Sequence, residues 1–147
     1  CILPTMVKLK STFVLVFLLI AVGCNAGISD KNLVFVSPSD VSLLMSSEST
    51  ELFGPELRTV LVDCRERAKF NKAHIPSATS IPFGHLNFKL YELDNAGVIV
   101  VSGDTFNDAV AIAMSKALME TGFKSVKTLR GGLTGWEEAG GTVITRE

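Results

Sequence analysis

The sequence is poor in the residues from which metal sites and disulfide frameworks are built. Its 147 residues include three cysteines, Cys1, Cys24 and Cys64, and two histidines, His74 and His85. No Cys-x-x-Cys pair occurs, and no histidine lies beside a cysteine. Structural zinc sites need four such ligands at short spacings, so a zinc site and a disulfide framework are both disfavoured. We therefore expect no metal and no cofactor.

An excess of basic residues is also missing. Lysine and arginine total 14 against 15 aspartate and glutamate residues. The only charged residues before Cys24 are Lys8 and Lys10, so the rest of the chain carries 12 basic and 15 acidic side chains. Nucleic-acid binding requires a basic footprint, which this balance does not provide. We expect no nucleic-acid partner and a monomeric protein.

The apolar run near the start is too short to cross a bilayer. Residues 13–22 form an uncharged stretch of ten residues, whereas a membrane span needs about 20. Lys8 and Lys10 precede this stretch, and the order of a positive segment, an apolar segment and small residues is typical of a signal peptide. We predict a signal peptide over residues 6–23, beginning at Met6, with residues 1–5 upstream of the start.

Small residues at 21–23 lead directly to Cys24. This arrangement resembles a bacterial lipoprotein signal, in which the cysteine is acylated and becomes the new amino terminus. The resemblance predicts lipidation of Cys24 and a periplasmic or cell-surface protein anchored to the membrane through that lipid. Residues 24–32 would form a tether. The alternatives are an ordinary secretory signal that is cleaved nearby and an uncleaved anchor.

Beyond the tether, short apolar runs alternate with segments of helical spacing. Strands are predicted at 33–36, 59–63, 80–82, 98–101 and 125–129, helical segments at 41–45, 66–71, 86–93 and 107–121, a surface loop at 46–56, and a last short helix containing Trp136. This alternation predicts an α/β domain over residues 33–147, with a mainly parallel five-stranded sheet and helices on both faces.

Two helical segments carry predictions about which side chains face the core. In the segment at 41–45 we expect Leu43 and Leu44 to point inward. The segment at 107–121 is expected to pack its small and apolar residues on the sheet: Ala109, Ile112, Ala113, Ala117 and Leu118.

The motifs at both ends of the domain resemble those of the rhodanese-like family. Residues 61–82 read LVDCRERAKFNKAHIPSATSIP, with Asp-x-Arg at a strand end followed by His-Ile-Pro-x-Ala and Ile-Pro. Residues 129–140 read LRGGLTGWEEAG, similar to the family's Gly-Gly-x-x-x-Trp segment. Their order and spacing match the family from residue 33 to residue 143. The resemblance implies a rhodanese-like fold and a sulfurtransferase-type site.

That site lacks its nucleophile. In active rhodaneses the loop after the fourth strand begins with a cysteine, whose thiolate accepts sulfur as a persulfide. Gly103 occupies this position here, and Asp108 stands where active members often carry an arginine. We predict a degenerate active-site loop composed of Gly103, Asp104, Thr105, Phe106, Asn107 and Asp108. Its two carboxylates are expected to repel thiosulfate or phosphate.

We expect the other motif residues to be structural: Asp63, Arg65, His74, Gly131, Gly132 and Trp136. Asp63 and Arg65 would form an ion pair that joins two loops, and His74 would hydrogen-bond to backbone. Trp136 would pack the last helix on the sheet. His85 is predicted to lie at the surface.

The sequence favours an exported, lipid-anchored and catalytically inactive rhodanese-like module that binds a protein or small ligand at the loop or serves as a scaffold. One alternative is a sulfurtransferase that uses Cys64 or a partner's cysteine, although Cys64 is better explained as a small buried hydrophobic residue. A second is a magnesium-dependent phosphatase-like site, because residues 103–108 are similar to the Gly-Asp-x-x-Asn-Asp motif of haloacid dehalogenase-like phosphatases. That family also needs an Asp-x-Asp motif, and Arg65 replaces its second acid.

Overall fold

Two runs of β-branched residues form the centre of the sheet. The structure is a computed structural model that describes residues 27–47 and 57–146. The predicted signal peptide, Cys24 and most of the predicted loop at 46–56 lie outside the described residues. Strand β2 (Arg58–Asp63) pairs in parallel with β5 (Ala96–Ser102) along its whole length. Both strands are buried at their carboxyl ends, as apolar strands of a parallel sheet usually are.

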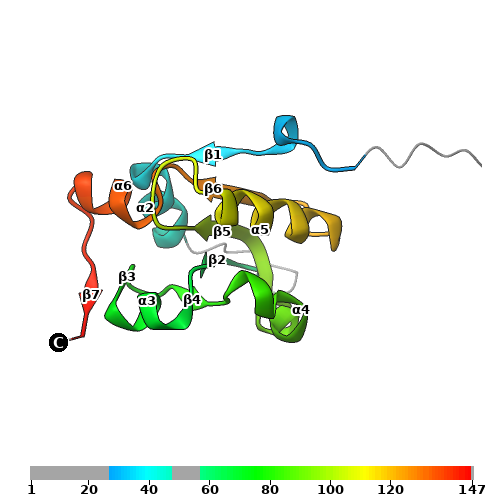
Figure 1. The fold of residues 1–147 in the computed structure, drawn as a ribbon. Coiled ribbons are helices and arrows are strands. Elements are labelled where there is room, and N and C mark those ends of the chain that lie inside the picture. The colour runs from blue at the N-terminus through cyan, green and yellow to red at the C-terminus, as the bar shows by residue number, and fades with distance from the viewer. Residues whose placement is uncertain (1–26, 48–56, 147) are drawn as a thin grey trace, which may run out of the picture.

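The remaining strands extend this pair on both sides. The sheet order is β1-β6-β5-β2-β4, with every neighbouring pair parallel. The added strands are β1 (Phe35–Val36), β4 (Thr79–Ser80) and β6 (Val126–Leu129). Figure 1 shows these strands between layers of helices. The predicted α/β fold with a five-stranded parallel sheet is therefore confirmed.

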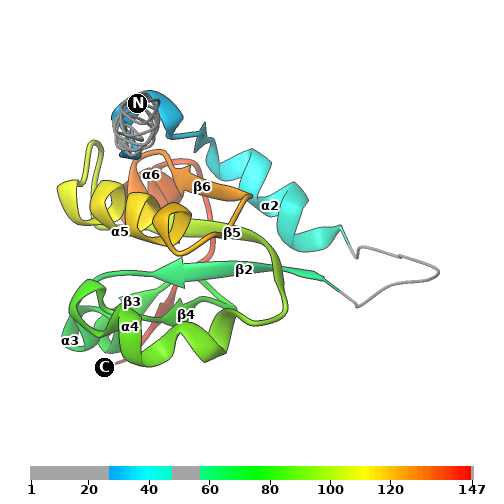
Figure 2. The same ribbon diagram turned by 90° about the vertical axis from the view of Figure 1, so that its right-hand side faces the viewer.

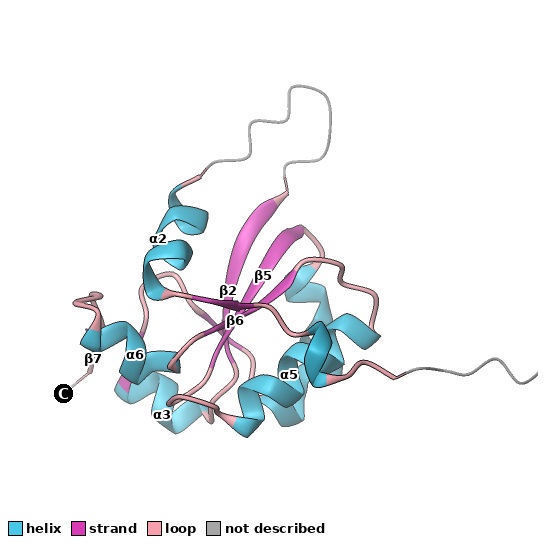
Figure 3. Cartoon of the chain, turned by 90° about the horizontal axis from the view of Figure 1, so that it is seen from above, coloured by secondary structure: helices cyan, strands magenta, loops and turns pink. Residues whose placement is uncertain are grey.

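Helices cover both faces of the sheet (Figure 3). One face carries α5 (Ala109–Glu120), α4 (Leu86–Lys89) and the 3-10 turn η4 (Leu90–Leu93). The other face carries α2 (Pro38–Ser46) and α6 (Gly132–Glu138). Two more short elements lie at the edges, α3 (Arg67–Lys72) and the 3-10 turn η3 (Phe83–His85). None of the helices within residues 27–47 and 57–146 has the length and hydrophobicity of a bilayer-spanning segment.

A second, two-stranded sheet was not predicted from the sequence. β3 (Ala73–His74) pairs antiparallel with β7 (Ile144–Thr145), which brings the carboxyl-terminal segment beside α3 (Figure 2). The backbone N–H of Arg146 extends this pairing by donating to the Lys72 carbonyl at 3.1 Å. At the other end, Asp30 in the turn η2 (Asp30–Asn32) forms an ion pair with Lys116 of α5. The last residues of the predicted tether are thus an ordered turn in contact with the domain.

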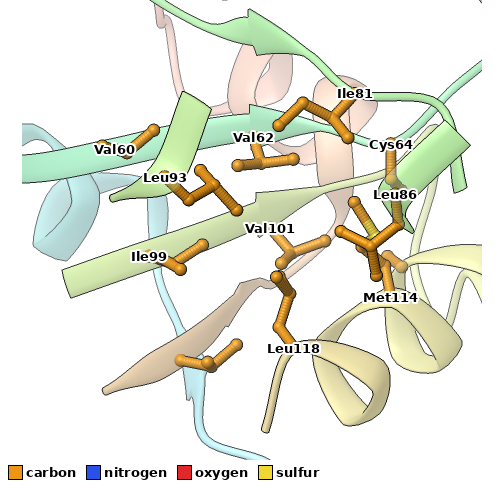
Figure 4. Packing of buried hydrophobic residues seen from close by; sticks show 12 residues of the cluster. Val60, Val62, Cys64, Ile81, Leu86, Leu93, Ile99, Val101, Met114 and Leu118 are labelled. Atoms are coloured by element: carbon orange, nitrogen blue, oxygen red, sulfur yellow. The ribbon is translucent and has the colours of Figure 1, made fainter. Parts of the chain in front are cut away.

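The larger core cluster lies between the sheet and α5 (Figure 4). Val60 and Val62 alternate along β2, and Ile99 and Val101 alternate along β5, so that all four point to the same face. Leu118 of α5 packs against them, together with residues from α4 and η4. Cys64 belongs to this cluster, with 2% of its surface exposed, as expected for a small buried hydrophobic residue.

The structure corrects the predicted inner face of α5. Its buried residues are Ala111, Met114, Ser115 and Leu118, so of the predicted set only Leu118 is fully buried, and Ala109 is exposed. The buried face follows the helical spacing of Ala111, Met114 and Leu118, and it also includes Ser115. The Ser115 hydroxyl hydrogen-bonds to the Thr128 hydroxyl at 2.8 Å, which allows a polar residue to lie on the buried face.

The predicted inner face of α2 is also partly wrong. Leu43 is 68% exposed, whereas Val41 is fully buried and Leu44 packs against the smaller core cluster. Val41 and Leu44 are three residues apart and share one side of the helix, while Leu43 and Leu44 lie about 100° apart around its axis. In this helix Val41 and Leu44 face the core, and Leu43 points toward solvent.

Candidate active site

Three chain segments meet where the central parallel strands end. β5 ends at Ser102 and is followed by the loop 103–108 and then α5. Asp63, at the end of β2, pairs with Ser102, and the Cys64 N–H donates to the Ser102 carbonyl at 3.1 Å. The Gly131–Gly132 pair follows the end of β6. This carboxyl edge of a parallel sheet is the usual location of binding sites in α/β proteins.

The Asp108 side chain folds back into the loop. Its Oδ2 accepts a hydrogen bond from the Asp104 N–H at 2.7 Å, and its Oδ1 accepts from the N–H groups of Val110 at 2.9 Å and Ala111 at 3.2 Å. Asp108 is therefore the N-cap of α5, where an anion is stabilised by unpaired backbone N–H groups and by the helix dipole. The carboxylate occupies the position in which this cradle could otherwise hold an external anion.

Gly103 leaves room for that carboxylate. A Cβ atom at position 103 would lie 2.6 Å from both Cγ and Oδ2 of Asp108 and 3.0 Å from Cβ of Ala111. No side chain fits there without movement of Asp108. The two predicted departures from the family, glycine at 103 and aspartate at 108, are therefore linked. The Asp108 carboxylate occupies the space that a side chain at position 103 would need.

The glycine pair after β6 holds the loop from the opposite side. Gly131 and Gly132 have positive φ angles of 83° and 55°, and a Cβ at Gly132 would lie 2.5 Å from the Gly103 carbonyl oxygen. This close approach allows the Leu133 N–H to donate to the Gly103 carbonyl at 2.9 Å and the Thr134 N–H to donate to the Asp104 carbonyl at 3.0 Å. The first turn of α6 thereby fixes the start of the loop.

A charge network anchors the other side of the loop. The buried Arg65 guanidinium donates to both oxygens of Asp63, with Nη2–Oδ2 at 2.7 Å and Nε–Oδ1 at 2.9 Å. It also donates to the Ala73 carbonyl at 2.6 Å and to Asp104 Oδ1 at 3.3 Å. Lys69 forms an ion pair with the second oxygen of Asp104. Asp63 and Arg65 thus form the predicted ion pair and join the loop to β3.

This network changes the charge expected at the site. Burial raises the pKa of Asp104, but hydrogen bonds from Lys69 and Arg65 outweigh burial and hold that pKa below its ordinary value of 3.8. Its negative charge is therefore compensated by two cations, and that of Asp108 by three N–H groups. Arg65 also binds Asp63, so the carboxylates of Asp63, Asp104 and Asp108 still outnumber the two cations, and the expected repulsion of anions stays a prediction.

Cys64 is poorly suited to act as a nucleophile. Burial, followed by the negative charges of Asp108 and Asp63, raises the pKa of the Cys64 thiol to about 12. The thiol donates to the Ser102 carbonyl at 3.2 Å. At neutral pH it is therefore protonated and faces the core, whereas sulfur transfer requires an accessible thiolate.

The remaining predicted residues are placed as structural elements. His74 Nδ1 lies 2.8 Å from the Phe70 carbonyl oxygen, and the two rings stack with centroids 4.0 Å apart. Trp136 is buried in the smaller core cluster, and its Nε1–H donates to the Thr142 carbonyl at 2.8 Å. His85 is exposed.

The magnesium alternative gains no support from this geometry. Asp104 and Asp108 direct their oxygens to different partners, cations for one and backbone N–H groups for the other. Within residues 27–47 and 57–146, no three His, Cys, Asp or Glu side chains are grouped so that they could hold a metal ion.

Sequence reasoning missed two features of the site. An aspartate directly before a helical segment is a signal for an N-cap, and Asp108 fits it. Lys69 gives no comparable signal, because its contact with Asp104 joins residues 35 positions apart. A pocket of about 320 Å³ lies beside the loop. Its lining residues include Arg65, Lys69, Asp104 and Phe83.

Comparison with known proteins agrees with this architecture. The rhodanese-like domain model matches residues 47–139, and the chain belongs to the rhodanese-like family. No curated protein is similar enough to count as a match.

Several solved structures share the fold. The BH2092 protein of Bacillus halodurans is 22% identical with a TM-score of 0.61, over 78% of this chain and 79% of its own. A rhodanese-related protein of Thermoplasma volcanium is 18% identical with a TM-score of 0.61, over 77% and 99%. The thiosulfate sulfurtransferase of Pseudomonas aeruginosa is 26% identical with a TM-score of 0.62, over 77% of this chain but only 20% of the enzyme.

The charge network predicts a specific response to acid. The folded-state pKa of Asp104 is lowered, so its contribution to stability is complete above pH 3.8 and is lost as the pH falls from there through the folded-state pKa. In the Asp104→Asn variant this contribution is absent. The free energy of unfolding, measured by urea titration at a series of pH values, should therefore fall less steeply below pH 4 than in the wild type.

Asp94→Asn provides the control. This exposed carboxylate has no ion-pair partner among the described residues, so the variant should retain the wild-type slope. Equal acid slopes for Asp104→Asn and the wild type would show that Lys69 and Arg65 do not stabilise the Asp104 carboxylate.

Proposed function

We propose that this rhodanese-like domain does not catalyse sulfur transfer and acts as a binding or scaffold module. The observation that carries the proposal is the position of the Asp108 carboxylate. It takes up the backbone N–H groups of Asp104, Val110 and Ala111, and it fills the space that a side chain at position 103 would need. Neither a thiolate nor an open anion cradle is left in the loop.

The proposed partner is a protein or a small ligand that binds beside the loop. The pocket of about 320 Å³ next to it has an apolar rim that includes Phe83 and Val110, and its charged lining is mixed, with two cations and three carboxylates. The side chains of Phe83 and Val110 are both exposed. A pocket without a nucleophile suits recognition, because binding a partner requires no reacting group.

We also propose that the protein is exported and held at a membrane by a lipid on Cys24, in the periplasm or at the cell surface. Support comes from the order of residues 6–24: a positive segment, ten uncharged residues, small residues and a cysteine. The ordered domain begins within a few residues of that cysteine, so a lipid there would hold the domain close to the bilayer.

The rival function is sulfur transfer by Cys64 or by a partner's cysteine. Family membership and the likeness to the Pseudomonas sulfurtransferase favour it. The environment of Cys64 opposes it, because the thiol is buried and its pKa is raised to about 12.

A sulfur-transfer assay distinguishes the two functions. Thiosulfate and cyanide are converted to sulfite and thiocyanate, with the enzyme thiol as the intermediate carrier of one sulfur atom. We expect the wild type and Cys64→Ser to release thiocyanate no faster than the heat-denatured protein. Turnover above that background by the wild type would contradict the proposal, and its loss in Cys64→Ser would identify the nucleophile.

Mass spectrometry of the mature protein tests the anchor. When the chain is produced from Met6 in a bacterium that processes lipoproteins, we expect a mature amino terminus at Cys24 whose mass includes acyl chains. The Cys24→Ser variant should lack those chains and leave the membrane fraction. A wild-type chain that is cleaved near Cys24 but carries no acyl chain would disprove the anchor.

A further inference from the structure

A second pocket lies on the β1 side of the active-site loop. Its volume is about 280 Å³, close to the lower end of the range for small-molecule sites. Its walls come from β1, the loop, the first turn of α5 and the end of β6. Asp108 contributes to this pocket and to the pocket beside Arg65, so the loop separates the two.

Arg130 supplies the positive charge in this pocket. It follows β6, and its guanidinium carbon lies 5.8 Å from the centroid of the Phe35 ring. Within the described parts of the chain Arg130 has no carboxylate partner, whereas Arg65 binds two. An exposed guanidinium that is held over an aromatic ring keeps its donors available to an incoming anion.

Phe106 forms an apolar wall beside Gly131. Its side chain is 53% exposed. The ring lies directly against Gly131, because a Cβ at that glycine would lie only 2.8 Å from the Phe106 Cζ atom. Ile112 and Phe35 add further apolar surface. Phe106 thus offers an aromatic surface on which an apolar ligand group could pack.

The Asp108 carboxylate also lines this pocket, and its oxygens are occupied by internal donors. Both of its carboxylate oxygens accept hydrogen bonds from N–H groups within the loop and at the start of α5. Among the lining residues Arg130 is the one cation, and it has free donors for an incoming anion, whereas both Asp108 oxygens are already hydrogen-bonded. One cation suits a single carboxylate, whereas a phosphate dianion usually requires several donors.

We propose that this pocket binds a small carboxylate with an aromatic body. The carboxylate pairs with the Arg130 guanidinium, and the ring packs on Phe106 and Ile112. The proposal rests on the proposed function, since it assigns a ligand class and a position to the binding role of the domain.

Titration with benzoate tests the proposal, with benzamide as a neutral analogue of the same shape. Backbone N–H signals of the full mature chain are followed by NMR. We expect saturable shifts at Phe35, at residues 105–108 and at Arg130, with benzamide binding at least about tenfold more weakly because it cannot form the ion pair.

Two variants and one control locate the interaction. Arg130→Gln should weaken benzoate binding at least about tenfold and remove the preference over benzamide. Phe106→Ala should weaken both compounds. Arg146→Gln, which removes an exposed arginine beyond β7, should leave both affinities unchanged. A dispersed spectrum establishes that each variant is folded.

Several results would overturn the proposal: no saturation by millimolar benzoate, equal binding of benzamide and benzoate, or shifts confined to residues around Arg65. These results are independent of the sulfur-transfer assay. Absence of both turnover and benzoate binding would remove this pocket as a carboxylate site and leave the non-catalytic assignment in place. Turnover together with benzoate binding would remove the non-catalytic assignment and leave this pocket as a carboxylate site.

Discussion

The hydrogen bonds between the Asp108 carboxylate and three backbone N–H groups determine how the rest of this edge of the sheet is built. They cap the amino end of α5, and they fold the loop 103–108 around the Asp108 carboxylate. Because the carboxylate fills the interior of the loop, position 103 must lack a side chain. A cysteine at position 103 would therefore meet the Asp108 carboxylate.

The neighbouring elements keep the loop in this conformation. The first turn of α6 binds the carbonyl groups of Gly103 and Asp104, and Arg65 and Lys69 bind the Asp104 side chain. These contacts hold the loop from two sides. A pocket lies on either side of the loop, and one of the two contains Arg130, which has no carboxylate partner within residues 27–47 and 57–146.

Much of the fold could be predicted from the sequence, because apolar β-branched runs such as residues 98–101 form buried strands in most contexts. The burial of Ser115 in α5 could not, because it depends on a hydrogen bond with Thr128, which lies on a later strand. The β3–β7 sheet could not be predicted from the sequence either, since each two-residue strand depends on a partner about 70 residues away. At the site, residue types predicted the loss of the nucleophile, but the position of the Asp108 carboxylate depends on the backbone path of the loop.

The most direct test of the central claim is to return a thiol to position 103 with and without the Asp108 carboxylate. Gly103→Cys and Gly103→Cys/Asp108→Ser are treated with thiosulfate, and intact mass is measured; attack of the thiolate on the sulfane sulfur releases sulfite and adds one sulfur atom to the protein. Serine at 108 preserves the N-cap and vacates the cradle. We predict a persulfide on the double variant and none on Gly103→Cys alone. Equal sulfur uptake by the two variants would contradict the conclusion that the Asp108 carboxylate occupies the active-site cradle.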